Sequence, residues 1–152
     1  MILSRRTMIL GVSSAPIVLL GTSGTATGIS PIYSENSVAI DGTDPVAYFT
    51  EGTAIAGVDT FTHGWNGAIW KFSTRENRIA FAADPTSYAP QYGGYCAYAV
   101  SEGYTAPTVP EAWTIVEGKL YLNFSLRIQR RWEQDIPGRI AAADKNWPKI
   151  LA

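Results

Sequence analysis

The chain has few side chains that bind soft metals or act as nucleophiles. Among its 152 residues are one cysteine, one histidine and two methionines, and the methionines lie at the N-terminus as Met1 and Met8. The lone cysteine, Cys96, cannot form a disulfide within the chain. The sequence also has no Ser/His/Asp triad order, phosphate-binding loop or HExxH pattern. Hydrolase and nucleotide-binding functions therefore have no support.

The chain also lacks a long apolar run and an excess of positive charge. The apolar run at 8–20 contains Ser13, Ser14 and Pro16, so it is too short and too broken to span a bilayer. The formal net charge is −1, and without residues 1–26, which hold two arginines and no acid, it becomes −3. We therefore expect no nucleic-acid partner and no stable membrane span.

The first 26 residues have the pattern of an export signal. Arg5 and Arg6 precede the apolar run, and small uncharged residues follow it up to a plausible cleavage site after Ala26. Paired arginines in this setting are typical of a twin-arginine signal. We expect a periplasmic or secreted mature protein, in which Cys96 is buried, metal-bound, reactive, or paired with an external thiol or partner protein.

The clearest local pattern is FTHGWNGAIWKF, residues 61–72. Asn66-Gly67 suits a type I′ turn, which predicts a β-hairpin. The predicted pairs are Trp65 with Ala68, His63 with Trp70, and Phe61 with Phe72. Because side chains alternate along a strand, the only histidine is expected on the apolar, inward face of this hairpin.

Helix signals follow the hairpin. Ser73 and Glu76 form a capping box at the start of a helix, and Asp84-Pro85 ends it and starts a further turn. Residues 95–103 suit a short helix, although a strand is also possible. Residues 112–124 predict a second hairpin that turns at Glu117-Gly118, and Ser125 is expected to cap the next helix.

The C-terminal region has an amphipathic helical stripe that ends before Pro148, formed by Ile136, Ile140, Ala143 and Trp147. The order of elements is strands, helix, strands and helices. We therefore predict an α+β fold, a small single domain with two β-hairpins packed against short helices and a helical C-terminus.

Three stretches of the sequence resemble one family, namely DGTDPVAYF (41–49), residues 65–100, and AWTIVEGKLYLNF (112–124). Together they resemble the exported bacterial YHS-domain-containing proteins over residues 36–150. The resemblance implies a fold and an exported location more than a defined reaction. YHS domains more broadly are linked to metal handling through cysteine ligands. Here Ala47, Ser73 and Asn77 stand where those cysteines would be, so the usual metal site does not carry over.

The Gly-Gly-Tyr-Cys stretch at 93–96 is the feature of this exported branch. The resemblance implies that some members carry selenocysteine at the position of Cys96, which would fit a soft nucleophile or ligand. The candidate catalytic residue is therefore Cys96, as a thiolate near a helix N-terminus. The candidate ligand pocket consists of His63, Tyr92, Gly93, Gly94 and Tyr95. The alternative is that Cys96 is a buried small hydrophobe.

Other candidates have structural explanations of equal or greater weight. His63 would join Cys96 as a metal ligand, or it is a core histidine beside Trp70. Asp41 and Asp44 form an acid or ligand pair, or they are turn formers. The spacing of Tyr92, Tyr95 and Tyr98 also suits core packing. The basic stripe of Arg127, Arg130 and Arg131 is expected to be a solvated face.

Three functions remain open, and enzymatic activity is left undecided. The first is thiol-centred redox chemistry at Cys96 with an external thiol. The second is binding of a soft metal such as copper by Cys96 and His63, with further ligands from elsewhere. The third is a non-catalytic binding or structural module in which Cys96 is merely packed.

Overall fold

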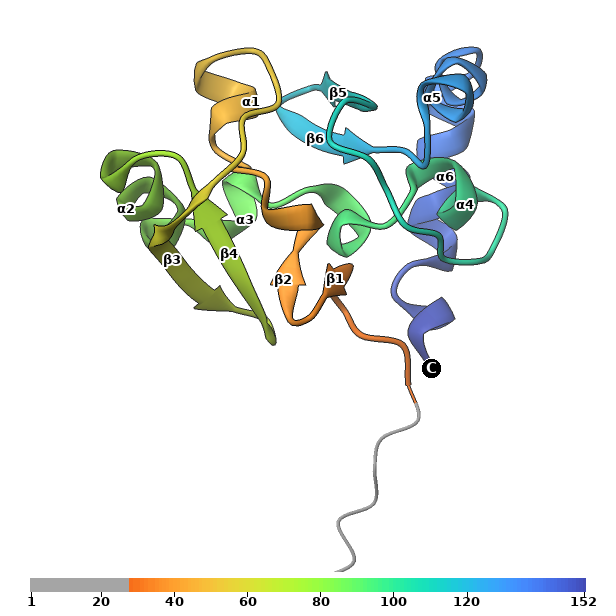
Figure 1. Ribbon diagram of the computed structural model, residues 1–152. Coiled ribbons are helices and arrows are strands. Elements are labelled where there is room, and N and C mark those ends of the chain that lie inside the picture. The colour runs from red at the N-terminus through yellow and green to blue at the C-terminus, as the bar shows by residue number, and fades with distance from the viewer. Residues whose placement is uncertain (1–27) are drawn as a thin grey trace, which may run out of the picture.

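The computed structural model describes residues 28–152, and the predicted export signal at 1–26 lies outside them. The fold is α+β, as predicted: two small sheets lie among short helices (Figure 1). In Figure 1 the β3–β4 hairpin and helix α2 lie on one side, and helices α4, α5 and α6 lie on the other. In this described part, no helix has the length and apolarity needed to cross a membrane.

The larger sheet has the strand order β1-β2-β4-β3, with a parallel pair between β2 and β4. Its strands are β1 (Ser34–Glu35), β2 (Val38–Ala39), β3 (Val58–Trp65) and β4 (Ala68–Phe72). The predicted pairs Trp65↔Ala68 and His63↔Trp70 are confirmed. The predicted pair of Phe61 with Phe72 is wrong, because a bulge in β3 brings Val58 opposite Phe72.

The cause of this shift lies outside the hairpin turn. Gly57, just before β3, lies so close to β4 that an added Cβ would be 2.4 Å from the carbonyl carbon of Lys71. Such an approach fixes the start of β3 beside the end of β4. The extra residues between this contact and the regular ladder then form the bulge.

The helices between the hairpins begin and end close to the predicted positions, as α2 (Arg75–Ala83), α3 (Pro85–Tyr88) and α4 (Ala97–Ser101). Helix α1 (Ala47–Thr50) precedes the first hairpin, in the stretch VAYF at 46–49, whose residues favour a short strand. The predicted cap of α2 is wrong by one residue: the Thr74 hydroxyl, not that of Ser73, accepts from the Asn77 N–H at 3.1 Å. Ser73 is engaged elsewhere, with the buried carboxylate of Asp44.

The second hairpin and the C-terminal helices agree with the sequence patterns. The hairpin consists of β5 (Trp113–Val116) and β6 (Lys119–Leu122), and the helices are α5 (Leu126–Glu133) and α6 (Ile136–Asn146). Ser125 caps α5 as predicted, because its hydroxyl accepts from the Ile128 N–H. Short 3₁₀ helices complete the chain: η1 (Ile40–Gly42), η2 (Gln91–Gly94) and η3 (Lys149–Leu151).

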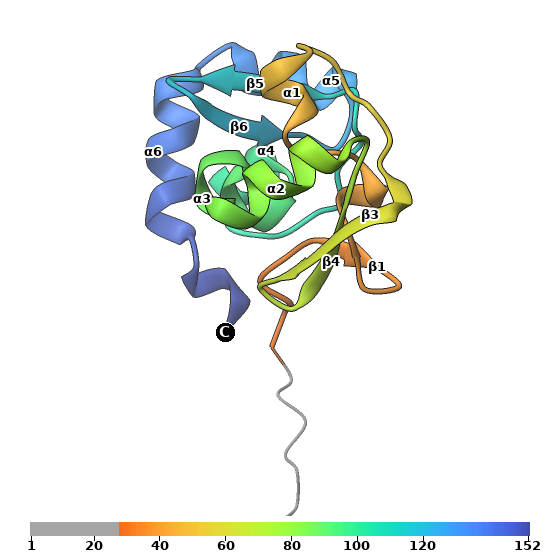
Figure 2. The ribbon, with the colours of Figure 1, turned by 90° about the vertical axis from the view of Figure 1, so that its left-hand side faces the viewer.

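The core joins two aromatic groups. One group packs α2 onto the first hairpin, with the Phe81 ring centroid 5.0 Å from that of Trp70 and 5.1 Å from that of Phe72. The other joins β6 to α5 through Tyr121 and Trp132, whose ring centroids are 5.2 Å apart. Figure 2 shows α2, α3 and α4 between the β5–β6 hairpin and the β3–β4 hairpin. This arrangement places the loop that contains the only cysteine in the interior.

Candidate functional site

Cys96 occupies the N-cap position of α4 and is 1% exposed. Its thiol donates to Oδ1 of Asn123 over 3.5 Å, and its sulfur accepts from the Phe124 N–H at 3.3 Å. The same Asn123 oxygen accepts from the Tyr98 N–H. The thiol thus joins the start of α4 to the chain that leaves β6, which is a structural role in itself.

The surroundings of Cys96 favour the protonated thiol. Burial raises the pKa of Cys96 above its ordinary value, and hydrogen bonds from the backbone at Ala99, Phe124 and Tyr98 offset this only in part. A cavity of about 320 Å³ borders the sulfur, and its lining is almost entirely apolar. The prediction of a low-pKa thiolate at a helix N-terminus therefore finds no support in this geometry.

His63 and Cys96 do not meet. The imidazole of His63 is half-buried on β3, with its ring centroid 6.2 Å from that of Phe81. Figure 1 shows β3 and α4 on opposite sides of the domain. Within residues 28–152, no group of three or more His, Cys, Asp or Glu side chains is placed to hold a metal ion. The structure therefore does not bring Cys96 and His63 together as ligands of one metal ion within a single chain.

Gly93 and Gly94 allow the motif to pack closely against residues 31–40 of the same chain. Gly93 has φ +64°, and a Cβ there would lie 1.8 Å from the carbonyl oxygen of Pro31. Gly94 has φ +85°, and its Cβ would lie 2.6 Å from Cγ2 of Ile40. The close backbone approach expected from Gly-Gly is therefore real, but for these positions the neighbour is the N-terminal segment and not a ligand.

The tyrosines of the motif also make internal bonds. The Tyr92 hydroxyl donates to Oδ1 of Asp144 on α6 at 2.9 Å, and the Tyr95 hydroxyl donates to the Ser30 carbonyl. Burial first, and then the hydrogen bond to Asp144, raises the pKa of Tyr92. Tyr92 itself has φ 58°, so the three tyrosines do not share one regular helix. Their helical spacing was misleading, although their predicted packing role is observed.

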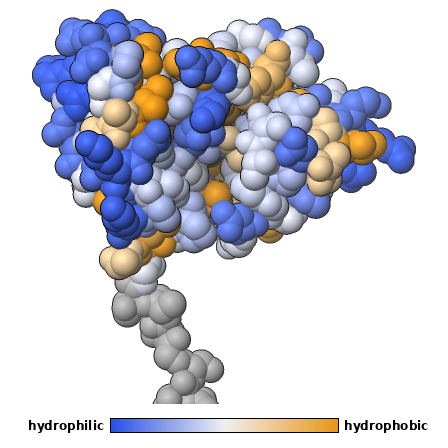
Figure 3. All heavy atoms as spheres, turned by 180° about the vertical axis from the view of Figure 1, so that it is seen from behind, coloured by the Kyte–Doolittle hydropathy of each residue, from blue (hydrophilic) through white to orange (hydrophobic). Residues whose placement is uncertain are grey.

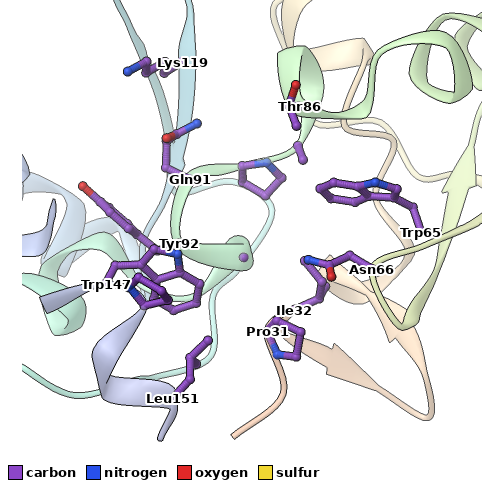
Figure 4. A pocket seen from close by; sticks show the side chains of 14 residues that line it. Pro31, Ile32, Trp65, Asn66, Thr86, Gln91, Tyr92, Lys119, Trp147 and Leu151 are labelled. Atoms are coloured by element: carbon purple, nitrogen blue, oxygen red, sulfur yellow. The ribbon is translucent and has the colours of Figure 1, made fainter.

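A second cavity lies beside this motif and does not include Cys96. It has a volume of about 540 Å³ and opens between the tip of the first hairpin and the end of α6 (Figure 4). Trp65 projects into it from the hairpin side, while Tyr92 and Trp147 lie on the opposite side. Of the predicted pocket residues, Tyr92 and Gly93 line it, whereas His63, Gly94 and Tyr95 do not. We call this cavity the aromatic cleft.

Sequence reasoning missed most of the aromatic cleft. Trp65 and Trp147 were assigned to packing faces, and Asn66 to a turn. Each assignment holds locally, since Trp65 contacts Trp70 and Phe81 and Trp147 caps α6. The cleft arises because the hairpin tip, the motif and the C-terminal end of α6 come together only in the folded chain.

Asp41 and Asp44 do not form a pair. Asp44 is fully buried, and its carboxylate accepts from the Val46, Ala47 and Ser73 N–H groups, the Ser73 hydroxyl and the Asn77 amide. Asp41 is exposed and accepts from the Tyr33 hydroxyl at 3.0 Å. Asp44 therefore has a structural role, because both of its carboxylate oxygens already accept hydrogen bonds within the chain. The predicted acid or ligand pair of Asp41 and Asp44 is not formed.

The basic stripe on α5 is a solvated face, as expected. Arg127, Arg130 and Arg131 are exposed. On the face shown in Figure 3, apolar side chains form separate spots among hydrophilic ones and not one broad area. That face therefore has no large apolar patch of the kind that marks a protein-docking surface.

Fold and site together define a small α+β domain with an open aromatic cleft and a buried thiol. Comparison of the chain with protein-family models, with curated proteins and with solved structures found no match.

Proposed function

We propose that the protein is a small, exported, non-catalytic module that binds a ligand in the aromatic cleft, with Cys96 packed for structure. The observation that carries the proposal is the separation of the two features. The cleft, at about 540 Å³, has the size of a ligand site and a mixed polar and apolar lining, whereas the only cysteine lies outside it and is 1% exposed.

The lining of the cleft supports binding more than catalysis. A ligand pocket is usually concave and largely apolar, with a few polar groups that fix orientation. Here the partly exposed indoles of Trp65 and Trp147 provide the apolar surface, with Tyr92, 5% exposed, packed against Trp147, and Asn66, Thr86, Gln91 and Lys119 provide polar groups. The lining contains no carboxylate, histidine or cysteine that would serve as an acid, a base or a nucleophile in ordinary enzyme chemistry.

One observation supports the YHS resemblance, which remains part of the proposal along with export. Ala47, Ser73 and Asn77 stand at the family's cysteine positions, and all three donate hydrogen bonds to Asp44. Two segments thus meet at Asp44, one with Ala47 through its backbone N–H and the other with Ser73 and Asn77, which are four positions apart. In this chain these three residues surround the buried carboxylate of Asp44, and none of them has a thiol.

The proposal is tested by screening a library of small fragments against the isotope-labelled full chain by NMR. We expect fragment binding to shift the indole N–H signals of Trp65 and Trp147, because both line the cleft, and to leave that of the fully buried Trp132, outside the cleft, unchanged. Tyr104→Ala is the matched control, since Tyr104 is 53% exposed and lies outside the cleft. The proposal fails if no fragment binds, or if fragments shift only signals around Cys96.

Thiol chemistry at Cys96 is the second candidate. The observation in its favour is the cavity of about 320 Å³ beside the sulfur, which Tyr104 and Phe124 border with half-exposed rings. A small apolar reagent that entered this cavity would lie beside Cys96. The raised pKa of Cys96 opposes this function, since the thiolate is the reactive form.

A further inference from the structure

We infer that the ligand of the aromatic cleft is a neutral oligosaccharide, an inference that rests on the proposed binding function. A sugar ring has apolar C–H faces and a rim of hydroxyl groups. It therefore needs aromatic surfaces and neutral hydrogen-bonding groups in the same groove. The cleft provides both, in the arrangement described below.

The aromatic surfaces lie on different walls. Trp65 comes from the hairpin tip, and Trp147 and Tyr92 face it from across the opening (Figure 4). The ring centroids of Tyr92 and Trp147 are 6.1 Å apart at a steep angle, so these two rings form an angled wall and not a single plane. Rings that enclose an open groove suit a ligand with several apolar faces and a wet outer edge.

The polar groups are mainly uncharged. The amides of Asn66 and Gln91 each present both a donor and an acceptor, whereas the Thr86 hydroxyl donates to Asp84 at 3.1 Å and offers the cleft an acceptor. Sugar hydroxyls, which also donate and accept, match such groups better than a purely acidic or purely basic ligand does.

The groove continues beyond the aromatic rings. An adjoining cavity of about 310 Å³ shares Thr86, Gln91 and Lys119 with the cleft. Its lining adds Ser87 and Glu117. Two neighbouring cavities with common walls accommodate a chain of rings and not just one ring.

Charge selects a neutral ligand. Lys119 is the charged residue that lines the aromatic cleft, and Glu117 is the charged residue that the adjoining cavity adds. These two opposite charges cancel among the lining residues. The Asp84 carboxylate, just outside the lining, accepts from the Thr86 and Ser87 hydroxyls and further disfavours an anionic ligand. A strongly anionic ligand would meet the carboxylate, and a cationic one would meet the ammonium group.

The test is titration of the full chain with cellohexaose, maltohexaose and hexa-N-acetylchitohexaose, followed by the NMR signals of the Trp65 and Trp147 indoles. We expect at least one of these neutral sugars to bind, with affinity that changes less than about twofold between about 50 and 500 mM salt. Trp147→Ala and Trp65→Ala should each weaken binding about tenfold or more, and Tyr104→Ala less than about twofold. Because Trp65 also packs against Phe81, Gln91→Ala provides a variant outside that aromatic group.

The outcomes separate this inference from the proposed function. If fragments shift the cleft signals but none of the three sugars does, the oligosaccharide inference is overturned and the binding module stands. Tighter binding of hexagalacturonate than of every neutral sugar would overturn the inference of a neutral ligand. Sugar binding that is insensitive to both Trp147→Ala and Gln91→Ala would place the site elsewhere and overturn it as well.

Discussion

Replacing Asp44 by asparagine is expected to lower the free energy of unfolding by about 3 kcal/mol or more. The Asp44 carboxylate accepts on both oxygens, from the Val46 and Ala47 N–H groups on one and from Ser73 and Asn77 on the other. An amide replaces one of these acceptors with a donor. Turned one way, its N–H₂ group faces the buried N–H groups of Val46 and Ala47; turned the other way, it faces the Ser73 N–H and displaces the bonds from the Ser73 hydroxyl and the Asn77 amide.

The size of this effect is large for a domain of this kind, whose total stability is on the order of 5–15 kcal/mol. Urea unfolding at neutral pH measures it directly. Asp41→Asn is the matched control, because Asp41 is exposed, accepts one hydrogen bond, and has a positive φ that asparagine tolerates. We expect the control to change stability by less than about 0.5 kcal/mol. Equal effects of Asp44→Asn and Asp41→Asn on the free energy of unfolding would show that the hydrogen bonds to the Asp44 carboxylate do not stabilise the fold as described.

Gly93→Ala is expected to destabilise the domain by about 3 kcal/mol or more, or to prevent folding. Two costs add at this position. The φ of +64° is unfavourable for any residue with a Cβ, and that Cβ would lie 1.8 Å from the backbone oxygen of Pro31. Relief of the clash requires movement of the N-terminal segment, whose Tyr33 N–H donates to the Gly93 carbonyl at 2.9 Å.

Gly67→Ala separates the two costs. Gly67 has φ +81° in the hairpin turn, but an added Cβ meets no atom within 4 Å. This variant should lose only the conformational cost, about 1–2 kcal/mol. The difference between the two variants in chemical denaturation therefore reports the close approach at Gly93. If Gly93→Ala is no worse than Gly67→Ala, the Gly-Gly pair is not a packing device.

Local patterns in the sequence predicted the local structure well. Asn66-Gly67 and Glu117-Gly118 defined both hairpins, and Ser125 capped α5, because turn and cap preferences depend on neighbouring residues. The errors occurred where a distant residue competes. Ser73 has the sequence of a cap, but Asp44, 29 residues away, binds its hydroxyl, and Thr74 caps instead.

The site was harder to predict for the same reason. The candidate pocket predicted from the sequence shares Tyr92 and Gly93 with the aromatic cleft, but the predicted chemistry was centred on Cys96, which lies outside it. Trp65 and Trp147 are 82 positions apart, and no local pattern indicates that they share a cavity. The separation of His63 from Cys96 likewise follows from the topology, which puts β3 and α4 on opposite sides.

The rate at which iodoacetamide alkylates Cys96, measured from about pH 6 to 10, tests the central claim most directly. The chain has one cysteine, so the signal has a single source, and Cys96→Ser supplies the blank. Because burial raises its pKa, the native thiol should titrate above the denatured chain's value of about 8.5 and react at least about tenfold more slowly at neutral pH. Alkylation of the native protein as fast as that of the denatured chain, with a titration at or below that value, would contradict a packed thiol and favour thiol chemistry.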